Sequence, residues 1–356
     1  NGVLLVLLAV AILIIVHRNL LNLSDFLDRE NPGQILPFEA ELSPGVRQKT
    51  ERKRDEIPVL ITATEDRLGA VIVAMNSVSR NSKANVAFTI VTLNDTVDHL
   101  AWISKTTLKN VKYKIVIFQP ELLNGKISKD PKMLEATKPL TFARFYLPMY
   151  IPEVEKAIYL DDDVVVQDIQ ELYEINLKPG HAAAFSDDCD SASAKGIVRA
   201  AGNQLQNNYM GFLDFKKEAI KKLGMKANTC SFNPGVIVAN LTEWKNQNVT
   251  QQLEKWMERN SEDLYSNTLA ESITTPPLLI VFYKRHSPIN PMWHVRHLIT
   301  GAGNRYSPQY VRTAKLLHWN GHYKPWGRTT SFSDVWDQWF IPDPTGKFHP
   351  VRKHAD

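Results

Sequence analysis

The chain has 356 residues, of which 44% are hydrophobic and 22% are charged, and these values exclude a disordered or fibrous protein. Its 42 lysines and arginines nearly balance its 38 aspartates and glutamates, so the net charge of +4 does not indicate nucleic-acid binding. The length fits one large α/β domain or two small ones after an N-terminal extension, and we favour one.

The N-terminal extension begins with an unbroken apolar run at residues 3–16, followed by a polar stretch to about residue 56. The run is shorter than the ~20 residues that span a bilayer, so it is either a cleaved signal peptide or an anchor whose start is missing. Its Ala-x-Ala sequence, at Ala9 and Ala11, precedes further apolar residues, which favours the anchor. We therefore expect a truncated signal anchor at 1–20, a stem at 21–56, a folded domain at 57–345 and a tail at 346–356.

Two further features agree with passage through the secretory route. Asn-x-Ser/Thr sequons accept N-linked glycans. The two cysteines either form one disulfide in an oxidising lumen or remain buried thiols. We expect a single-pass type II protein of the Golgi or endoplasmic reticulum membrane, with its folded domain in the lumen. The sequons begin at Asn22, Asn94, Asn240 and Asn248, and the cysteines are Cys189 and Cys230.

The folded part begins with alternating strand and helix patterns. This alternation is typical of a parallel, doubly wound sheet, and its first strand-to-helix loop, residues 64–69, is where a nucleotide usually binds. The expected strands are residues 57–63, 85–93 and 113–118, and the expected helices are residues 67–80 and 98–109.

The later part of the chain is less regular. A small-residue strand at 180–186 leads into an acidic loop, and residues 195–222 form a polar surface segment. The stretch Phe232-Asn233-Pro-Gly opens another buried strand. We expect an amphipathic helix at 242–259 and a last strand at 276–282.

Three aspartates interrupt an apolar run at residues 157–166, where Asp161, Asp162 and Asp163 separate Ile-Tyr-Leu from Val-Val-Val. The run predicts a buried strand, and buried carboxylates are unfavourable unless they are paired, protonated or bound to a cation. In an extended backbone Asp161 and Asp163 point the same way, so these two can share one hard cation, while Asp162 points oppositely. At the carboxyl end of a strand they would face a cleft. The alternative is a solvated turn rich in aspartate.

A second stretch, residues 316–326, concentrates His318, Gly321 and Lys324. These are a metal ligand, a glycine that allows close approach of the backbone to a ligand, and a cation suited to phosphate. The alternative for His318 is an ordinary core histidine. Arg144, on an expected short helix with an aromatic surface, can bind a phosphate or pair with one of the acids.

These stretches, in this order, resemble glycosyltransferase family 8, whose members pair a Leu-Asp-x-Asp strand end with a C-terminal His-x-x-Gly-x-x-Lys-Pro-Trp. Both motifs are present in full, at residues 160–163 and 318–326, and the resemblance covers residues 57 to about 339. Within the family the chain looks most like the membrane-anchored vertebrate members. The resemblance implies an α/β fold of GT-A type, a mostly parallel nucleotide-binding sheet flanked by helices with an associated acceptor-binding region. It also implies retaining transfer from a nucleotide sugar, typically UDP-linked, with Mn²⁺ as cofactor and Mg²⁺ as the alternative.

Carried over position by position, the resemblance implies Asp161, Asp163 and His318 as metal ligands. It implies that Lys324 and the backbone at Gly321 hold the diphosphate. A cation held by two carboxylates and one imidazole keeps sites for two phosphate oxygens and neutralises the leaving diphosphate. The other implied substrate-binding residues are Thr62, Ala63, Thr64, Arg67, Arg144, Asn233 and, through its backbone, Asp162, and the implied catalytic candidates are Asp187 and Asp188.

The chain departs from the family pattern at two places. Where UDP-binding members often carry an aspartate and a base-stacking aromatic residue, this chain has Thr64 and Arg67, and a guanidinium can stack on a base. Where bacterial relatives place an Asp-Gln-Asp group beneath the sugar, residues 272–277 hold no carboxylate. Glu271 is a poor nucleophile candidate, so we prefer front-face substitution, in which the departing diphosphate helps deprotonate the acceptor.

Three functions compete on this evidence. The first is an active retaining glycosyltransferase whose acceptor, a glycan, protein or lipid, the sequence does not define. The second is a non-catalytic relative that binds a nucleotide sugar or a glycan in the lumen. The third, a metal-dependent phosphohydrolase, needs a water-activating base or a second metal cluster that the sequence does not show. The intact motif residues favour the first.

Overall fold

The computed structural model describes residues 56–127, 138–188, 209–265, 270–298, 306–321, 323–328 and 330–352. All of them belong to the second of the two units of the chain, Phe38–Asp356. The expected anchor and stem, the sequon at Asn22, and Cys189 lie outside these ranges. Within the described ranges, no helix is long and apolar enough to cross a membrane.

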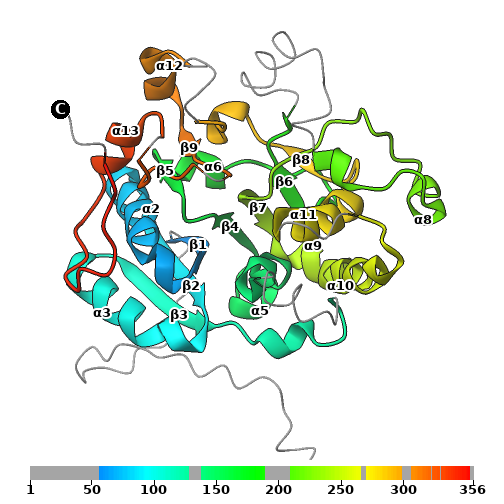
Figure 1. Ribbon diagram of the computed structural model, residues 1–356, viewed down its shortest axis with the longest axis horizontal. Coiled ribbons are helices and arrows are strands. Elements are labelled where there is room, and N and C mark those ends of the chain that lie inside the picture. The colour runs from blue at the N-terminus through cyan, green and yellow to red at the C-terminus, as the bar shows by residue number, and fades with distance from the viewer. Residues whose placement is uncertain are drawn as a thin grey trace, which may run out of the picture. The chain divides into compact units, whose positions relative to one another are not determined.

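The first part of the fold consists of β1 (Glu56–Ala63), α2 (Leu68–Asn81), β2 (Asn85–Thr92), α3 (Val97–Thr107), β3 (Lys112–Ile117) and β4 (Lys156–Leu160). β2 pairs in parallel with β1 on one side and β3 on the other, and β1 also pairs in parallel with β4 (Figure 1). The predicted alternation of strands and helices is confirmed. α2 is buried on two sides because it packs against this sheet and also carries Ala70 and Val73 into a separate apolar cluster.

The three aspartates form a joint between two sheets. β4 ends at Leu160, and the next strand, β5 (Val164–Val166), pairs antiparallel with β9 (Leu316–His318) in a separate two-stranded sheet. The prediction of one buried strand through residues 157–166 is therefore wrong. The chain changes sheets at the acids because β9, which is remote in sequence, supplies a partner for β5.

The rest of the main sheet comprises β7 (Val236–Asn240), β6 (Ala183–Phe185) and β8 (Ser287–Pro288). The strand order is β3-β2-β1-β4-β7-β6-β8, and β7 runs antiparallel to both of its neighbours. The other strands of this sheet share one direction, so the fold is a mostly parallel α/β sheet. The small residues of β6 and the β-branched residues of β7 are buried on both faces, as expected for central strands.

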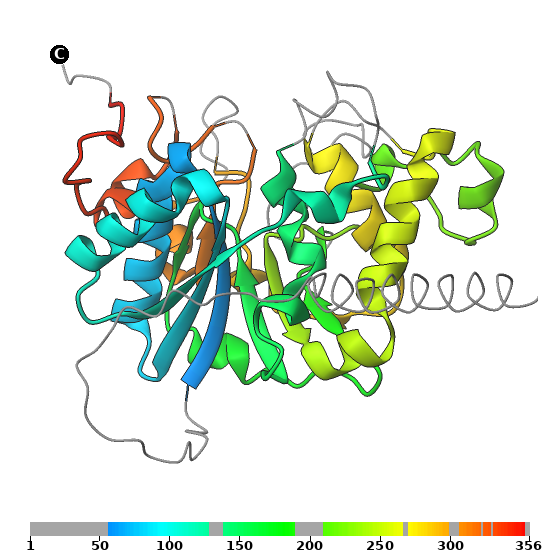
Figure 2. The same cartoon turned by 90° about the horizontal axis from the view of Figure 1, so that it is seen from below.

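Helices α9 (Leu241–Asn246), α10 (Val249–Arg259) and α11 (Ala270–Val281) pack around the antiparallel part of this sheet (Figure 2). The single helix predicted at 242–259 is divided, because Asn248 adopts a left-handed φ of 52°. The strand predicted at 276–282 is wrong, since these residues continue α11. The hydrophobic periodicity of a short apolar run does not distinguish a buried strand from a buried helix. The other α-helices in the described ranges are α5 (Leu147–Tyr150), α6 (Gln170–Tyr173), α8 (Glu218–Lys221), α12 (Pro308–Thr313) and α13 (Ser333–Asp337).

A third apolar cluster joins the C-terminal residues to α2. Trp319 and Trp336 are fully buried in it, together with Phe348 from the segment expected as a tail. A Cβ at Gly69 of α2 would lie 2.1 Å from Cδ1 of Phe348, so glycine is needed for the aromatic ring to approach the helix. This cluster lies beside β5 and β9, the two strands next to the aspartate joint.

Candidate functional site

Asp161 and Asp163 are anchored by backbone hydrogen bonds on the two sides of the joint. The N–H of Asp161 donates to the carbonyl of Gly235 at 2.8 Å, and the N–H of Trp319 donates to the carbonyl of Asp163 at 3.1 Å. Asp163 is buried with 3% of its surface exposed, and Asp161 is half-buried. The joint therefore fixes both carboxylates at the carboxyl end of β4, the edge where α/β sheets bind ligands.

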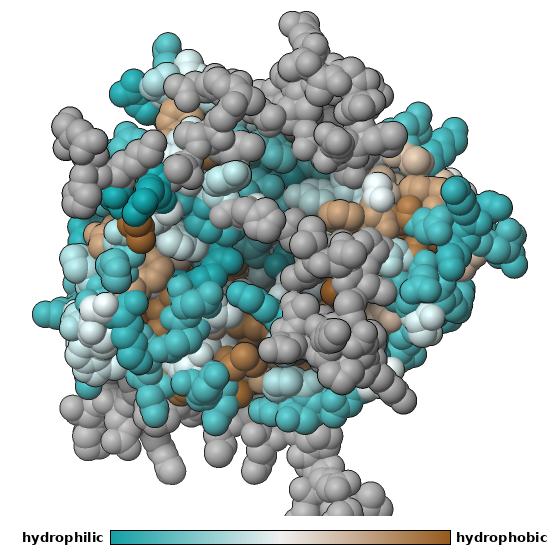
Figure 3. Space-filling model, viewed as in Figure 1, coloured by the Kyte–Doolittle hydropathy of each residue, from teal (hydrophilic) through white to brown (hydrophobic). Residues whose placement is uncertain are grey.

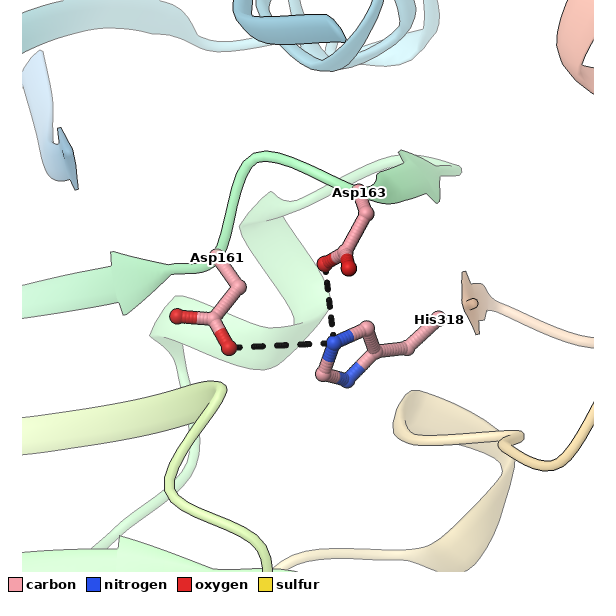
Figure 4. A group of neighbouring side chains, drawn as sticks. All are labelled: Asp161, Asp163 and His318. Atoms are coloured by element: carbon pink, nitrogen blue, oxygen red, sulfur yellow. Dashed lines mark ion pairs between the residues drawn. The ribbon is translucent and has the colours of Figure 1, made fainter. Parts of the chain in front are cut away.

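His318 completes a cluster with these two aspartates (Figure 4). It is the last residue of β9 and stands opposite Val164 in the β5–β9 pairing, which brings its ring next to the joint. Its Nε2 lies 2.9 Å from Oδ1 of Asp163 and 3.7 Å from Oδ2 of Asp161. The three ligand atoms lie within 4.8 Å of one another, so one cation can contact all of them.

The cluster fits a divalent cation by two tests. Oδ1 of Asp163 is buried and meets no geometric hydrogen-bond partner among the described residues, although it lies 2.9 Å from Nε2 of His318, so it retains a lone pair for a cation. A Cβ at Gly235 would lie 2.4 Å from Cε1 of His318 and 2.6 Å from Oδ2 of Asp161, so the glycine leaves room for both ligands. Two carboxylates and one imidazole suit Mn²⁺ or Mg²⁺.

Asp162 is not part of the group that could hold a metal ion, and it forms an ion pair with Arg67. Burial raises the pKa of Asp162 to about 7, against the lowering effect of the Arg67 charge. Burial also acts to raise the pKa of Asp163, but the charges of Lys324, His318 and Arg67 outweigh it and hold that pKa well below its usual range. The pKa of Asp162 is thus shifted in the opposite direction from that of Asp163, although both carboxylates pair with Arg67.

Two basic side chains flank Oδ2 of Asp163, the outer oxygen of this carboxylate. Nη2 of Arg67 lies 3.1 Å from Oδ2 of Asp163, and the Lys324 ammonium forms an ion pair with the same oxygen. The ammonium also donates to the carbonyl of Trp319 at 3.1 Å. The Arg67 guanidinium lies over the Trp326 ring, 5.2 Å from its centroid. Arg67, expected as a base-stacking residue, is thus placed beside the acids.

The opposite side of the cluster contains Arg144 and Tyr159. Nη2 of Arg144 is 3.1 Å from Oδ1 of Asp161, and its Nη1 donates to the carbonyl of Pro234 at 3.1 Å. The Tyr159 hydroxyl donates to the same Asp161 oxygen at 2.9 Å. Tyr159 was not predicted as a site residue, but it precedes Asp161 by two positions in an extended strand and so lies on the same face.

A cavity of about 210 Å³ extends from the cluster. It is lined by the predicted residues Thr62, Thr64, Arg67, Arg144, Asn233, Gly321 and Lys324, together with the three aspartates and His318. Ala63 is fully buried and is not part of the lining. On the face shown in Figure 3, hydrophilic residues border a hollow near the centre. The structure thus brings together most of the residues that the sequence proposes.

Eight further lining residues were not predicted as site residues, namely Lys138, Leu140, Thr141, Tyr209, Pro234, Thr274, Thr275 and Asn320. The Tyr209 hydroxyl accepts a hydrogen bond from Nδ2 of Asn233 at 2.8 Å. Thr274 and Thr275 lie in α11, each with 2% of its surface exposed. The family resemblance already implied that residues 272–277 lie beneath the sugar, but because this segment holds no carboxylate, neither threonine was proposed as a site residue.

Asp187 and Asp188 do not line this cavity. Oδ1 of Asp187 is 2.8 Å from Nε2 of His286, and Asp187 lines a separate cavity of about 480 Å³. Asp188 is buried, forms an ion pair with the fully buried Arg296 and accepts a hydrogen bond from the Ser231 hydroxyl. Burial raises the pKa of Asp188 although the Arg296 charge opposes this. Both predicted catalytic acids therefore have partners outside the metal-ligand cluster.

The fold is of the GT-A type found in glycosyltransferases. The structure is similar to the galactosyltransferase LgtC in complex with donor and acceptor sugar analogues, with a TM-score of 0.57, 20% identity, and coverage of 82% of this chain and 100% of that chain. It is also similar to the apo WbbM bifunctional glycosyltransferase, with a TM-score of 0.58, 17% identity, and coverage of 84% of this chain and 52% of that chain. At these identities the likeness concerns the fold.

The family follows from the sequence comparisons. The model for glycosyl transferase family 8 matches residues 58–330, and the chain belongs to this family. It is 68% identical over 364 residues to glycosyltransferase 8 domain-containing protein 1 of Danio rerio, covering 100% of this chain and 98% of the relative. It is 59% identical over 362 residues to the Homo sapiens protein of the same name, covering 100% of this chain and 97% of the relative.

Proposed function

We propose that the protein is a metal-dependent, retaining glycosyltransferase that moves a sugar from a UDP-linked donor to a glycan, protein or lipid acceptor. The observation that carries the proposal is the convergence of Asp161, Asp163 and His318 on one point at the cavity, with Lys324 beside it. These three residues would hold Mn²⁺, with Mg²⁺ as the alternative. When bound, the cation would neutralise charge on the leaving diphosphate as a Lewis acid.

The neighbouring cations suit the diphosphate of the donor. Lys324 and Arg67 lie against the outer oxygen of Asp163 and line the cavity, where charge-assisted contacts to phosphate oxygens are within their reach. Gly321 has a φ of +88°, a conformation that side chains disfavour, and apart from its chain neighbours no atom of the described residues lies within 4 Å of the position of a Cβ. A phosphate can therefore approach the backbone there.

The lining of the cavity favours front-face substitution. Among the described residues that line it, the carboxylates are those of residues 161–163, which the cation and Arg67 engage, and Thr274 and Thr275 supply only hydroxyls. No lining carboxylate is thus left to act as a covalent nucleophile. In the proposed step the bond from the sugar C1 to the diphosphate breaks and the acceptor oxygen bonds to C1 on the same face. The acceptor proton passes to the departing phosphate oxygen.

A lumenal location is part of the proposal. Cys230 is in a disulfide bond, which is typical of an oxidising compartment. The sequon residues Asn94 and Asn248 are exposed, whereas the Asn240 side chain caps α9 by accepting from the N–H of Glu243 at 2.9 Å. With the apolar run at residues 3–16, these features support a Golgi or endoplasmic reticulum protein with a type II anchor. Protease protection and glycosidase sensitivity in microsomes test this location.

The second candidate function is a catalytically inactive relative that binds a nucleotide sugar or a glycan. The observation that favours it is the position of Arg67, which is held by Asp162 and Asp163 where an aromatic residue would stack on the base in UDP-binding members. Transfer to a defined acceptor separates the two functions, because a binding protein shows ligand-dependent stabilisation without a glycosylated product.

The test of the proposal starts with ligand binding to the purified full chain. UDP-sugars should raise the thermal unfolding midpoint with Mn²⁺ and much less without it, because a ligand stabilises the state that binds it. Asp163→Asn should weaken calorimetric Mn²⁺ binding by more than the roughly 10–100-fold typical of losing an outer-shell partner. Asp168→Asn, the same exchange outside the cluster, is the control.

Products are then sought with UDP-sugar panels and glycan, protein and lipid acceptors, and the anomeric configuration is read by NMR. Inversion at C1 would overturn the retaining mechanism. Equal Mn²⁺ affinity in Asp163→Asn and the parent protein would overturn the metal assignment.

A further inference from the structure

His294 and His318 lie next to each other in the interior of the protein. Their ring planes differ by 6°, and Nε2 of His294 is 2.8 Å from Nδ1 of His318. The two residues have 0% and 1% of their surface exposed. A direct hydrogen bond, shielded from solvent, therefore joins the inner nitrogen of His318 to His294.

The backbone fixes this pair on both sides. The N–H of Val295 donates to the carbonyl of Leu316 at 3.0 Å, and the N–H of His318 donates to the carbonyl of Val295 at 2.9 Å. The N–H of His294 donates to the carbonyl of Pro291 at 3.0 Å, which closes the 3₁₀ helix Pro291–Trp293. The two imidazoles are thus held in register by the main chain and not only by their contact.

The outer nitrogen of His318 determines which proton arrangement a cation requires. Nε2 faces both Asp161 and Asp163, at 3.7 and 2.9 Å, so it is the nitrogen available for a metal ion. A neutral imidazole that ligates through Nε2 carries its proton on Nδ1. That N–H must donate to an acceptor in the protein interior, and Nε2 of His294 is at hydrogen-bond distance.

We propose that His294 is a positioning residue of the metal site, which accepts a hydrogen bond from Nδ1 of His318 and so directs the Nε2 lone pair of His318 toward the cation. Metal-ligating histidines usually donate to a carboxylate, a backbone carbonyl or water. Here a neutral imidazole takes that role and adds no charge to the interior. The inference rests on the proposed metal dependence and extends it to a residue outside the ligand set.

One further observation agrees with this role. When Nε2 of His294 accepts the hydrogen bond, its proton is on Nδ1, and this nitrogen is buried without a hydrogen-bond partner among the described residues. An unpaired buried donor is unfavourable, and its presence is explained if the residue is needed for its other nitrogen.

The experiment compares two replacements of His294 in the full chain with Mn²⁺ alone as the probe. His294→Phe keeps a ring of similar shape and removes the acceptor, and should lower Mn²⁺ affinity roughly 10–100-fold by calorimetry. His294→Gln places an amide oxygen near the position of Nε2 and should restore most of the affinity. His286→Phe is the same exchange at a histidine outside the cluster, and should leave Mn²⁺ affinity unchanged.

Pulsed EPR of the bound Mn²⁺ supplies a readout that a merely structural role would not move. The coupling to the His318 nitrogen should be lost or altered in His294→Phe and should return in His294→Gln. If the Phe variant does not unfold cooperatively, His294→Leu replaces it as the acceptor-free protein. Parent-like affinity and coupling in a folded acceptor-free variant would overturn the inference while leaving the metal site in place. Absence of Mn²⁺ binding by the parent protein would overturn the proposed metal dependence as well.

Discussion

Replacing Gly235 by alanine is the most direct test of how closely the metal ligands are packed. A Cβ at this position would lie 2.4 Å from Cε1 of His318 and 2.6 Å from Oδ2 of Asp161. The backbone of Gly235 is not left-handed, so the expected effect is steric. Alanine therefore pushes directly on two of the three residues that would hold the cation.

Neither residue has room to retreat. Behind the His318 ring, Nε2 of His294 is only 2.8 Å away, and Asp161 is held by the Tyr159 hydroxyl at 2.9 Å and by Arg144 at 3.1 Å. The new contact is about 1 Å too short, 2.4 Å against the 3.4 Å of ordinary contact. Metal sites tolerate about ±0.2 Å in ligand distance, and losing even a supporting contact of a ligand costs roughly 10–100-fold in metal affinity, so we take the upper value for a ~1 Å displacement. We therefore expect Mn²⁺ affinity to fall by about 2.7 kcal/mol.

Titration calorimetry of Gly235→Ala with Mn²⁺ measures this loss, with Gly180→Ala as the matched control. Gly180 has a φ of +74°, and apart from its chain neighbours no atom of the described part of the chain lies within 4 Å of a Cβ position, so alanine there strains the backbone without touching the cluster. The control should lose about 1 kcal/mol of stability and none of its Mn²⁺ affinity. A Gly235→Ala protein that binds Mn²⁺ within about twofold of the parent would refute the reasoning. The expected loss in affinity is much larger than twofold, because 1.4 kcal/mol already corresponds to tenfold.

Two further predictions concern stability. Gly69→Ala should lower the free energy of unfolding by about 1–2 kcal/mol, because displacing the Phe348 ring outweighs the ~1 kcal/mol that alanine adds to a helix. In a Phe348→Ala background, Gly69→Ala should instead raise the free energy of unfolding. Urea unfolding of the parent, the two single variants and the double variant measures both effects. Burial acts to raise the pKa of Asp343, but hydrogen bonds from Thr345 and Phe348 lower it. The resulting stability is present above pH ~4 and lost as the pH falls through the folded pKa. Asp343→Asn should flatten this acid limb, and an unchanged limb would contradict the assignment.

That Asp161 and Asp163 lie together at the site could be predicted from the sequence, because acids are unusual in such a segment. Carboxylates inside an apolar run need a partner, and alternation along an extended chain selects Asp161 and Asp163 over Asp162. Their setting could not be predicted. β5 leaves the main sheet only because β9 pairs with it, and no pattern near residue 164 reports a strand that begins at Leu316.

Other parts of the site carry no local signal. Thr274 and Thr275 reach the cavity because their segment is helical, and the neighbouring apolar residues are equally compatible with a strand. Tyr209 follows a polar stretch without any period. His294 precedes a β-bridge at Val295, and its relation to His318 arises from the pairing of Val295 with Leu317. Pairing between segments that are far apart in the sequence brings such residues to the site, and no pattern close to any of these residues reports that pairing.

The charges around the cluster explain why cation and donor should bind together. The carboxylates of residues 161–163 are matched by Arg67, Arg144 and Lys324, so the cluster is close to neutral when all six groups are ionised. A divalent cation would leave an excess of about two positive charges, which complements the roughly two negative charges of a UDP-sugar diphosphate. Without the cation, the three basic side chains remain engaged by aspartates and offer a diphosphate little net attraction. Donor binding should therefore depend on a bound cation, even though Arg67 and Lys324 line the cavity with and without it.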